Sequence, residues 1–192
     1  EHNLQSLRVV DHLEQRYPEF DGLNLCFETR EGILKHCSRR HAHALEKAEP
    51  GGVARRFLDG TQPSLEAQLC NLADEIAYNA HDIDDGVRSG LLDLAQLEAV
   101  PLFERFRRAA CREHPRLAGR RVLYESIRRM LSQQVYDVID ATRAALARER
   151  PADADAVRRA AAPLAGFSPA MARESVELKR FLHARLYRHP QV

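Results

Sequence analysis

Residues 72–86, which read LADEIAYNAHDIDDG, place acidic, aromatic and histidine side chains at helical spacing. With about 100° of rotation per residue in an α-helix, Asp74, Tyr78, His81, Asp82 and Asp85 fall on one side of the helix. We call these five residues the acidic ridge. The opposite side collects apolar residues that can pack in a core, namely Leu65, Leu69, Leu72, Ile76 and Ile83. The stretch therefore predicts a long amphipathic helix.

An ordinary amphipathic helix whose polar side meets water gives the same pattern, and periodicity alone favours it. Two features favour a binding surface instead. Tyr78 lies in the middle of the acidic ridge, and its ring is better suited to a partly dry groove, where its face can stack and its hydroxyl can hydrogen-bond. The carboxylates repel one another unless a cation or a polar ligand offsets their charge. Both interpretations stay open from periodicity alone.

The composition is that of a globular protein. The 192 residues are 44% hydrophobic and 30% charged, enough for one sizeable core or two small ones, and no apolar run is long enough to span a membrane. The cysteines are widely spaced and form no CxxC pair, which indicates buried or idle thiols in a reducing cytoplasm rather than a zinc ribbon or a disulfide framework. They are Cys26, Cys37, Cys70 and Cys111.

Charge gives no global attraction to nucleic acid, because the formal net charge is only +1. The arginine doublets at 39–40, 55–56, 107–108, 120–121 and 128–129 are separate, and each is more typical of a solvated helix edge than of a phosphate site. The chain begins at Glu1 and its first residues lack the features of a signal peptide. We therefore expect it to be a segment of a longer protein.

Helical periodicity dominates along the chain, so we predict an all-α fold. The expected helices cover residues 4–16, 29–45, 64–84, 91–98, 102–113 and 122–148, with a last helix that begins after Ser168-Pro169. Gly86 is expected to stop the third of these helices. The alanine-rich residues 150–166, bounded by prolines, are the expected flexible connection. The helix over 122–148 carries an apolar stripe expected in the core: Leu123, Ile127, Met130, Leu131, Val135, Val138 and Ile139.

The chain contains no P-loop, nucleophile elbow or dinucleotide-binding glycine motif. The chemistry that remains is that of histidine and aspartate. Metals such as Mn²⁺, Fe²⁺ or Zn²⁺ accept imidazole nitrogen and carboxylate oxygen together, so an aspartate on a helix beside histidines from other helices can form a metal site. Asp74 is the natural ligand in the acidic ridge.

Several segments, taken in order, resemble one enzyme family. They are EHNLQSLR (1–8), GLNL (22–25), EGILKH (31–36), SLEAQ (64–68) and the 72–86 stretch. Together they resemble the dGTPase-like deoxynucleoside triphosphate (dNTP) triphosphohydrolases of the HD-domain superfamily. Such enzymes are all-α and use a metal-activated water to release triphosphate from a dNTP. The resemblance implies that residues 1–90 are the later part of an HD-type catalytic core, incomplete at its N-terminal side, with residues 91–192 as a helical region packed on it.

The family holds its metal with a histidine, a His-Asp doublet and a later aspartate on a helix. The resemblance implies that Asp74 is this last aspartate, a ligand of Mn, Mg, Fe or Zn. Tyr78 and Asp82 then meet the sugar: Asp82 accepts from the 3′-hydroxyl, and the ring of Tyr78 excludes a ribose 2′-hydroxyl by its bulk. His2 matches a phosphate-contacting, catalytic histidine and Asn3 lies beside it as a substrate-binding candidate. A frayed terminal histidine is the alternative for His2.

The first histidine and the doublet of the family precede the segment that matches this chain. One aspartate supplies too few oxygens for a metal that takes about four or more ligands, so we expect the isolated chain to be inactive. An alternative takes His81-Asp82 as the doublet. Its first ligand would be His36, His41 or His43 and its last Asp137 or Asp140. This alternative disagrees with the Asp-x-x-x-Tyr-x-x-x-Asp pattern, which matches the helix of the final aspartate.

Two further groups of basic residues have two interpretations each. His36, His41 and His43 lie near Lys35 and two arginines, and they are more typical of a basic helix C-terminus stabilised by the helix dipole than of a metal or phosphate site. The last helix carries Lys179, Arg180, Tyr187 and His189, which fit an exposed helix edge better than contacts to the phosphates of a substrate or effector.

Two functions follow. The first is that of a portion of a metal-dependent dNTP triphosphohydrolase, which converts a dNTP and water to a deoxynucleoside and triphosphate. The second is a non-catalytic helical module for assembly or nucleotide sensing. For the intact enzyme the resemblance implies a homo-oligomer with a dNTP substrate, and it leaves open whether a nucleotide effector binds. The cysteines favour a cytoplasmic protein, and we expect no membrane partner.

Overall fold

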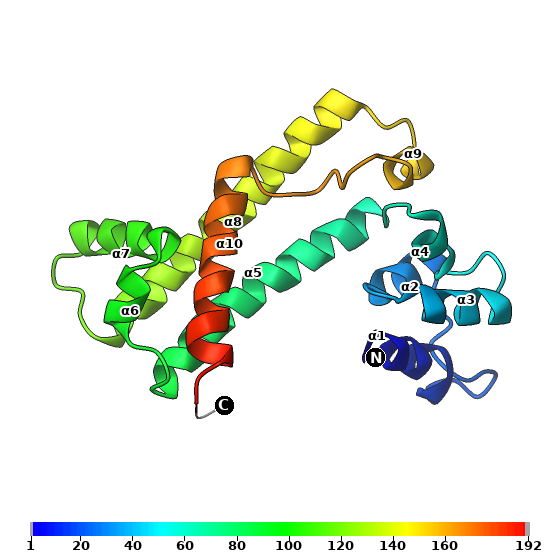
Figure 1. The fold of residues 1–192 in the computed structure, drawn as a ribbon, viewed down its shortest axis with the longest axis horizontal. Coiled ribbons are helices and arrows are strands. Elements are labelled where there is room, and N and C mark those ends of the chain that lie inside the picture. Colours follow the sequence, from blue (N-terminus) through cyan, green and yellow to red (C-terminus); the bar gives the residue numbers. More distant parts are fainter. Residues whose placement is uncertain (1, 191–192) are drawn as a thin grey trace. The chain divides into compact units, whose positions relative to one another are not determined.

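The computed structural model of the chain describes residues 2–190. These residues form helices and no strand, with one isolated bridge between Gln15 and Gly22. The all-α prediction is therefore confirmed. Figure 1 labels the α-helices, which are α1 (His2–Arg8), α2 (Phe27–Ile33), α3 (Arg39–Ala48), α4 (Arg55–Asp59), α5 (Leu65–Arg88), α6 (Leu94–Glu98), α7 (Pro101–Glu113), α8 (Arg120–Glu149), α9 (Ala154–Arg158) and α10 (Pro169–Leu182). Two π-helical segments follow α1 and α10, namely η1 (Val9–Leu13) and η2 (His183–Tyr187).

The chain divides into two compact units. Unit 1 comprises Glu1–Asn71 and Leu146–Ala165, and unit 2 comprises Leu72–Ala145 and Gly166–Val192. Glu1 and residues 191–192 lie outside the described residues. The expected domains, 1–90 and 91–192, follow a different division and remain a prediction about the intact protein.

Unit 1 has a small core of its own, formed by Leu7, Leu34, Ala42, Val53 and Ala54. The segment after η1 folds back onto it, because the amides of Gly22 and Leu23 donate to the carbonyl oxygens of Glu14 and Val10. Gly22 has a φ of +76°, and a Cβ there would lie 2.2 Å from the Asp11 carbonyl oxygen. Only glycine fits this close backbone approach.

The helix expected over 29–45 is wrong, because the structure has two helices there, α2 and α3. The chain turns at Leu34, whose side chain is fully buried in the core of unit 1. Ser38 then starts α3, since its hydroxyl accepts from the His41 amide and so satisfies a free N–H of the first turn. Burial and a new cap therefore interrupt a pattern that reads as one helix.

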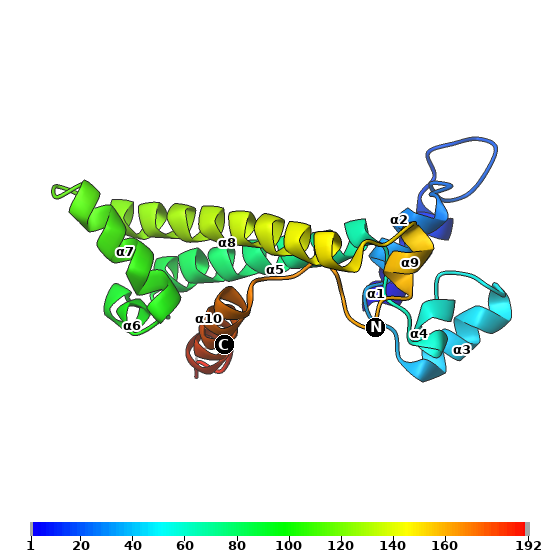
Figure 2. The same ribbon diagram turned by 90° about the horizontal axis from the view of Figure 1, so that it is seen from above.

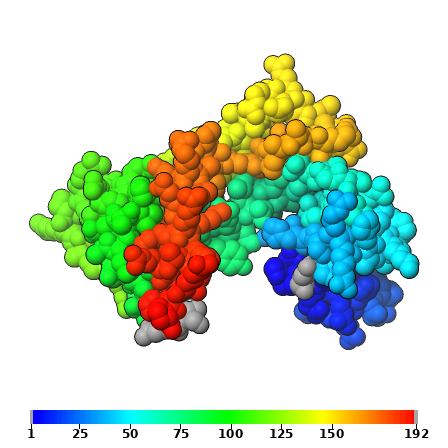
Figure 3. All heavy atoms as spheres, viewed as in Figure 1, coloured from blue at the N-terminus to red at the C-terminus, as the bar shows by residue number. Residues whose placement is uncertain are grey.

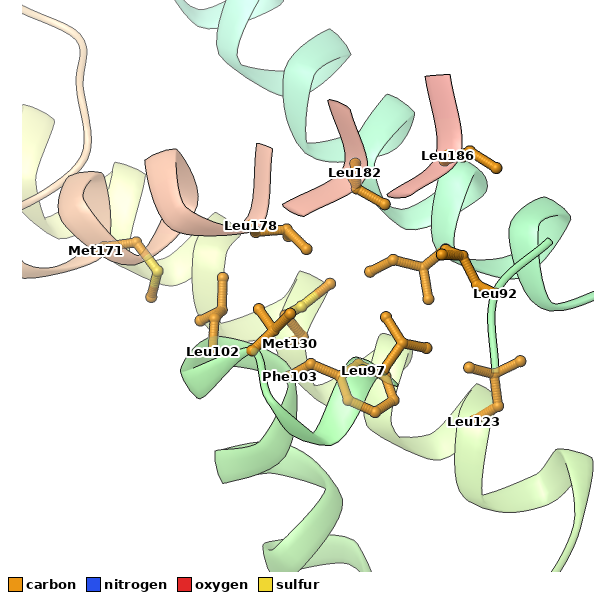
Figure 4. Packing of buried hydrophobic residues seen from close by; sticks show 12 residues of the cluster. Leu92, Leu97, Leu102, Phe103, Leu123, Met130, Met171, Leu178, Leu182 and Leu186 are labelled. Carbon is orange, nitrogen blue, oxygen red and sulfur yellow. The ribbon is translucent and has the colours of Figure 1, made fainter. Parts of the chain in front are cut away.

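Unit 2 surrounds the larger core, which joins residues of α5, α6, α7, α8, α10 and η2. Figure 4 shows Leu97, Phe103, Met130 and Leu178 pointing toward one another from four of these helices. Burying such side chains contributes about 1.5–3 kcal/mol each. This apolar packing fixes one side of α5, because Ile83 is fully buried within it.

Gly86 does not stop α5, contrary to the expectation, since the helix continues to Arg88. A Cβ on Gly86 would lie 2.6 Å from a methyl group of Leu92, so the glycine allows the following chain to pack closely on the helix. Gly90, with a φ of +77°, lies just beyond the end of the helix. Left-handed glycines are common at that position.

Residues 150–166 also differ from the expectation of a flexible connection. They contain α9, and they bury Val157, Leu164 and Ala165 in unit 1. The side-chain oxygen of Gln68 accepts from the amides of Leu164 and Ala165 at 2.8 and 3.0 Å. The segment is thus held by burial and by hydrogen bonds.

The stripe on α8 is only partly in the core. Leu123, Met130 and Val138 are buried, whereas Val135 and Ile139 are exposed. The buried side includes two polar residues that donate hydrogen bonds within the fold: Ser126 donates to a backbone carbonyl and the Gln134 side-chain nitrogen to Ser175. The start of α10 agrees with the sequence, because Ser168 caps it and Pro169 follows.

In residues 2–190 none of the helices combines the length and apolar character needed to cross a bilayer.

Candidate functional site

The acidic ridge lies on α5 as the spacing predicts. Ser64 starts the helix by accepting from the Ala67 amide at 3.2 Å. On the packed side Ile76 and Ile83 are buried, as expected, while Leu69 near the beginning of the helix is exposed. Since the packed side is fixed in the core, the ridge points outward.

The members of the acidic ridge differ in how far solvent reaches them. Asp74 and Asp82 are half-buried, and His81 and Asp85 are exposed. Tyr78 is 63% exposed, so no described residue encloses its ring in the expected dry groove. His81 is a helix-surface residue, as its position suggested.

Two side chains from α10 and η2 contact α5 beside the ridge. The Lys179 ammonium lies 2.7 Å from the Glu75 carboxylate, and the Tyr187 hydroxyl donates to the Asp82 carboxylate. Glu75 and Asp82 are about two turns apart, as are Lys179 and Tyr187. The two contacts therefore follow the same order along α5 and along α10 and η2. In Figure 3, α10 and η2 form the orange-to-red strip on the surface of unit 2.

The contact with Asp82 also affects the ionisation of Tyr187. Burial and the hydrogen bond to Asp82 raise the pKa of Tyr187 to about 12. The phenol therefore stays protonated at neutral pH and remains a donor. One oxygen of Asp82 is oriented by this bond, while the carboxylate is still within reach of solvent.

Neither of the two interpretations of the last helix describes it fully. Lys179 and Tyr187 are exposed residues of a helix edge, yet both contact side chains of α5. Glu75 is not among the candidate residues that the sequence predicts. The only sequence signal for these contacts is a similar spacing: Glu75 and Asp82 are seven residues apart, and Lys179 and Tyr187 are eight apart. This similarity has a meaning only once the two helices are known to be neighbours.

His2 and Asn3, the other site candidates, belong to unit 1. His2 is exposed at the start of α1. Asn3 is buried, and its amide donates to the His36 carbonyl oxygen at 3.3 Å. This bond gives Asn3 a structural role in unit 1, and the substrate role assigned to both residues stays a prediction.

The sequence favours a basic helix C-terminus for the histidines of residues 36–43, and this prediction is wrong. His36 lies between two helices and His41 and His43 are in the first half of α3, because the expected single helix is broken there. The ring of His41 contacts the Ser38 hydroxyl at 3.1 Å.

Among residues 2–190, no three or more histidine, cysteine, aspartate and glutamate side chains gather as a set able to hold a metal ion. Asp137, named in the alternative ligand set, accepts from the amide and hydroxyl of Ser168 at the start of α10. None of the four cysteines, which all lie within residues 2–190, forms a disulfide, and Cys26 and Cys70 are exposed rather than buried.

The segments that carry the family resemblance meet at the start of α5. The Glu31 carboxylate accepts from the Ser64 amide at 3.3 Å, and the Cα of Gly32 leaves room for Ala67, whose Cβ would lie 3.6 Å from an added Cβ. Gln68 binds the chain at 164–165. These short motifs therefore build the first turns of the helix that carries the ridge.

No family model matches the chain. Three similar proteins, each named deoxyguanosinetriphosphate triphosphohydrolase-like protein, come from Bordetella pertussis, Ralstonia nicotianae and Thiobacillus denitrificans. They are 60%, 60% and 56% identical over 192, 189 and 192 residues, which is 100%, 98% and 100% of this chain. The chain spans about half the length of these relatives, namely 48%, 47% and 50%. With this identity along its whole length, the chain belongs to the family of deoxyguanosinetriphosphate triphosphohydrolase-like proteins.

Proposed function

We propose that the intact protein is a divalent-metal-dependent dNTP triphosphohydrolase of the HD-domain type and that this chain supplies one wall of its active site. The proposal is supported by the acidic ridge, which is found in a chain that is 56–60% identical to dGTPase-like proteins. Asp74, Tyr78 and Asp82 lie on successive turns of one helix, outward from a fixed core. The reaction converts a dNTP and water to a deoxynucleoside and triphosphate.

Each residue of the wall has a separate task. Asp74 offers a carboxylate to the metal, while Asp82, oriented by Tyr187, accepts a hydrogen bond from the 3′-hydroxyl of the sugar. The exposed ring of Tyr78 occupies the space that a ribose 2′-hydroxyl would need. Lys179 balances the charge of Glu75, which keeps that second carboxylate from competing with its neighbour Asp74 for cations.

The metal is Mn, Mg, Fe or Zn, and its other ligands come from residues outside this chain. Metals of this kind take about four or more ligands, and Asp74 is one carboxylate. When bound, such a metal supplies Lewis-acid activation of water for attack at the α-phosphorus. His2 contributes a phosphate contact and Asn3 lies beside it. The intact enzyme is cytoplasmic, assembles as a homo-oligomer and responds to a nucleotide effector.

The test is triphosphate release from dGTP by the intact protein with Mn²⁺. We expect Asp74→Ala to lower turnover by about a thousandfold or more, because loss of a metal ligand removes the chemistry. Asp85→Ala is the matched control, since Asp85 is an exposed ridge aspartate without an assigned task. Full activity of Asp74→Ala would refute the ligand assignment. If the intact wild-type protein releases no triphosphate, the non-catalytic module is the better description.

Sugar selectivity tests Tyr78 separately. Tyr78→Ala should reduce the preference for dGTP over GTP by about tenfold or more, because the ring no longer fills the 2′ position. Tyr78→Phe keeps the ring and should keep the preference. An unchanged preference in Tyr78→Ala would exclude the steric role.

An assay of the isolated chain tests whether this one wall of the active site is sufficient for activity. We expect the isolated 192 residues to release no triphosphate above background from dGTP with Mn²⁺ or Mg²⁺. Turnover at an ordinary enzymatic rate would show that the chain itself holds a complete metal site.

A further inference from the structure

Unit 1 contains a hollow that the proposed reaction does not use. It has a volume of about 260 Å³ and is lined by residues of α1 and η1 and by residues of α3. Figure 2 labels α1 and α3 in unit 1. Pockets for drug-sized ligands have volumes of about 300–1,000 Å³, so this hollow suits a smaller molecule.

Half of the lining is apolar. Leu4 and Leu7 come from α1, and Ala44 and Leu45 come from α3. Leu7 is buried in the core of unit 1, while Leu4 and Leu45 pack against that core and stay partly exposed. This surface can bury a short apolar chain, and each methylene group that it buries raises the affinity about fourfold.

The other half of the lining is polar and favours an anion. It consists of Arg8, Asp11, His12 and His41. Asp11 is the one acid of this lining, and the Arg30 guanidinium donates to both of its oxygens at 2.9 Å. The charge of Asp11 is therefore already compensated by a paired hydrogen bond.

Arg8 is the cation that remains for a ligand. It is exposed, and neither Arg8 nor His12 forms a side-chain hydrogen bond or an ion pair with any residue in 2–190. The ring of His41, by contrast, contacts the Ser38 hydroxyl at 3.1 Å. A guanidinium group binds a carboxylate through two parallel hydrogen bonds. Arg8 thus offers a place for one carboxylate beside the apolar half of the lining.

The hollow is separate from the site proposed for the reaction. Leu4, Leu7 and Arg8 share one side of α1, because residues three and four positions apart are neighbours on a helix. His2, the proposed phosphate contact, lies about 160° around the helix from Leu4. A ligand in the hollow would therefore contact the side of α1 that faces away from His2.

We propose that this hollow, defined by Leu4, Leu7, Arg8, Ala44 and Leu45, binds a small carboxylate with an apolar tail, of the class of medium-chain fatty acids. The carboxylate pairs with Arg8, and the tail lies on the leucines of α1 and α3. A nucleoside triphosphate fits less well, because one free guanidinium group leaves most of its phosphate charge unpaired against an apolar lining. An alkylammonium ion fits less well because Arg8 repels its charge.

Octanoate is the probe, and nuclear magnetic resonance of the 192-residue chain measures its binding. We expect saturable shifts of the amide signals of α1 and α3, with a dissociation constant of about 1 mM or lower. Hexanoate, which is two methylene groups shorter, should bind about tenfold more weakly. Octylammonium has the same tail with the opposite charge and should bind more weakly than octanoate.

Arg8→Gln tests the carboxylate contact. It should weaken octanoate binding about tenfold, because a hydrogen bond between charged groups is lost. The affinity for neutral octanol should not change. Arg39→Gln is the matched control, since Arg39 is also exposed and lies about 160° around α3 from His41, outside the hollow. The control should keep the wild-type affinity for octanoate.

Filling the hollow is an independent test. Ala44→Leu should weaken octanoate binding about fivefold or more, because the larger side chain takes the space of the tail. Ala44 is exposed and leucine is a good helix former, so this variant should fold. His43→Leu adds the same side chain at an exposed position outside the hollow and should leave octanoate binding unchanged.

Saturation-transfer resonance of octanoate with the intact protein repeats the measurement on the longer chain, where we also expect binding. Five results would overturn the proposal: no saturable binding to the 192-residue chain or to the intact protein, octylammonium or acetate binding as tightly as octanoate, equal losses in the two arginine variants, unchanged binding in Ala44→Leu, or displacement of octanoate by dGTP.

Discussion

Unit 1 and the acidic ridge of unit 2 both carry several carboxylates, but they differ in what those carboxylates contact. In unit 1, Glu31 is 1% exposed and accepts from the Ser64 amide and the Arg158 guanidinium. Arg30 likewise holds two carboxylates with paired hydrogen bonds, to Asp11 at 2.9 Å and to Glu49 at 2.7–2.8 Å. In unit 1 these carboxylates are therefore neutralised by ion pairs with arginines.

On the ridge, by contrast, no arginine fork closes on Asp82 among the described residues. Asp82 is half-buried and accepts a hydrogen bond from a neutral phenol, that of Tyr187. A phenol orients a carboxylate and leaves its negative charge uncancelled. The difference teaches that unit 1 uses carboxylates to hold the chain together, whereas on the ridge Asp82 is oriented by a neutral donor and stays within reach of a ligand.

The largest expected effect separates the two kinds of carboxylate directly. Glu31→Gln should lower the free energy of unfolding by about 3 kcal/mol, because it leaves the partly buried charge of Arg158 without its closest partner. Asp82→Asn, the same isosteric change on the ridge, should cost less than about 1 kcal/mol. Urea unfolding followed by circular dichroism measures both.

Equal losses in the two variants would erase the contrast, since they would make Asp82 a structural residue. A loss in Asp82→Asn alone would reverse it. Activity of the intact protein adds a second readout, because only the Asp82 variant should also weaken dNTP binding.

The sequence predicted the ridge because it depends on one helix. Asp74, Tyr78 and Asp82 share a side through the 3.6-residue period, and the period is a local property. The start of α10 was likewise predicted, since Ser168 and Pro169 act within one turn. What the ridge can do with a ligand was available only through the family resemblance.

What the sequence did not reveal depends on residues distant along the chain. Tyr187 and Asp82 are 105 positions apart, and no local pattern marks them as partners. The break after Ile33 depends on burial of Leu34 in a core built from other segments. Gly86 reads as a helix stop until Leu92 is seen to pack against it.

A smaller effect on the free energy of unfolding is expected from the glycines that lie where helices pack in the two units. In unit 2 the back of α5 is held by apolar packing, so Gly86→Ala should lower stability by about 1 kcal/mol. The added methyl group overlaps Leu92 and costs about 1–3 kcal/mol, which exceeds the helix preference for alanine of about 1 kcal/mol.

Gly32→Ala in unit 1 is the matched control, since Gly32 is also helical and an added Cβ would make only ordinary contact with Ala67 at 3.6 Å. It should raise stability by up to about 1 kcal/mol. Thermal unfolding of the two variants should therefore shift in opposite directions. A stabilised Gly86→Ala would mean that the core around Leu92 yields easily.

The smallest expected effect on stability comes from the phenol that orients Asp82. The folded-state pKa of Tyr187, about 12, lies above the ordinary value of about 10. Folding therefore favours the protonated phenol. The stability that it contributes is fully present below about pH 10 and is lost as the pH rises toward 12. At neutral pH, Tyr187→Phe should cost less than about 1 kcal/mol, because this hydrogen bond is partly exposed.

Ultraviolet titration of the tyrosines makes this small effect measurable. Tyr187→Phe should remove the ionisation step near pH 12, and Asp82→Asn should move that step part of the way toward pH 10, because the partial desolvation of the Tyr187 phenol persists without the charge. A step that stays in place in Asp82→Asn would show that burial alone raises the pKa. The ridge carboxylate would then lack the orienting bond, and its contrast with the clamped carboxylates of unit 1 would rest on exposure only.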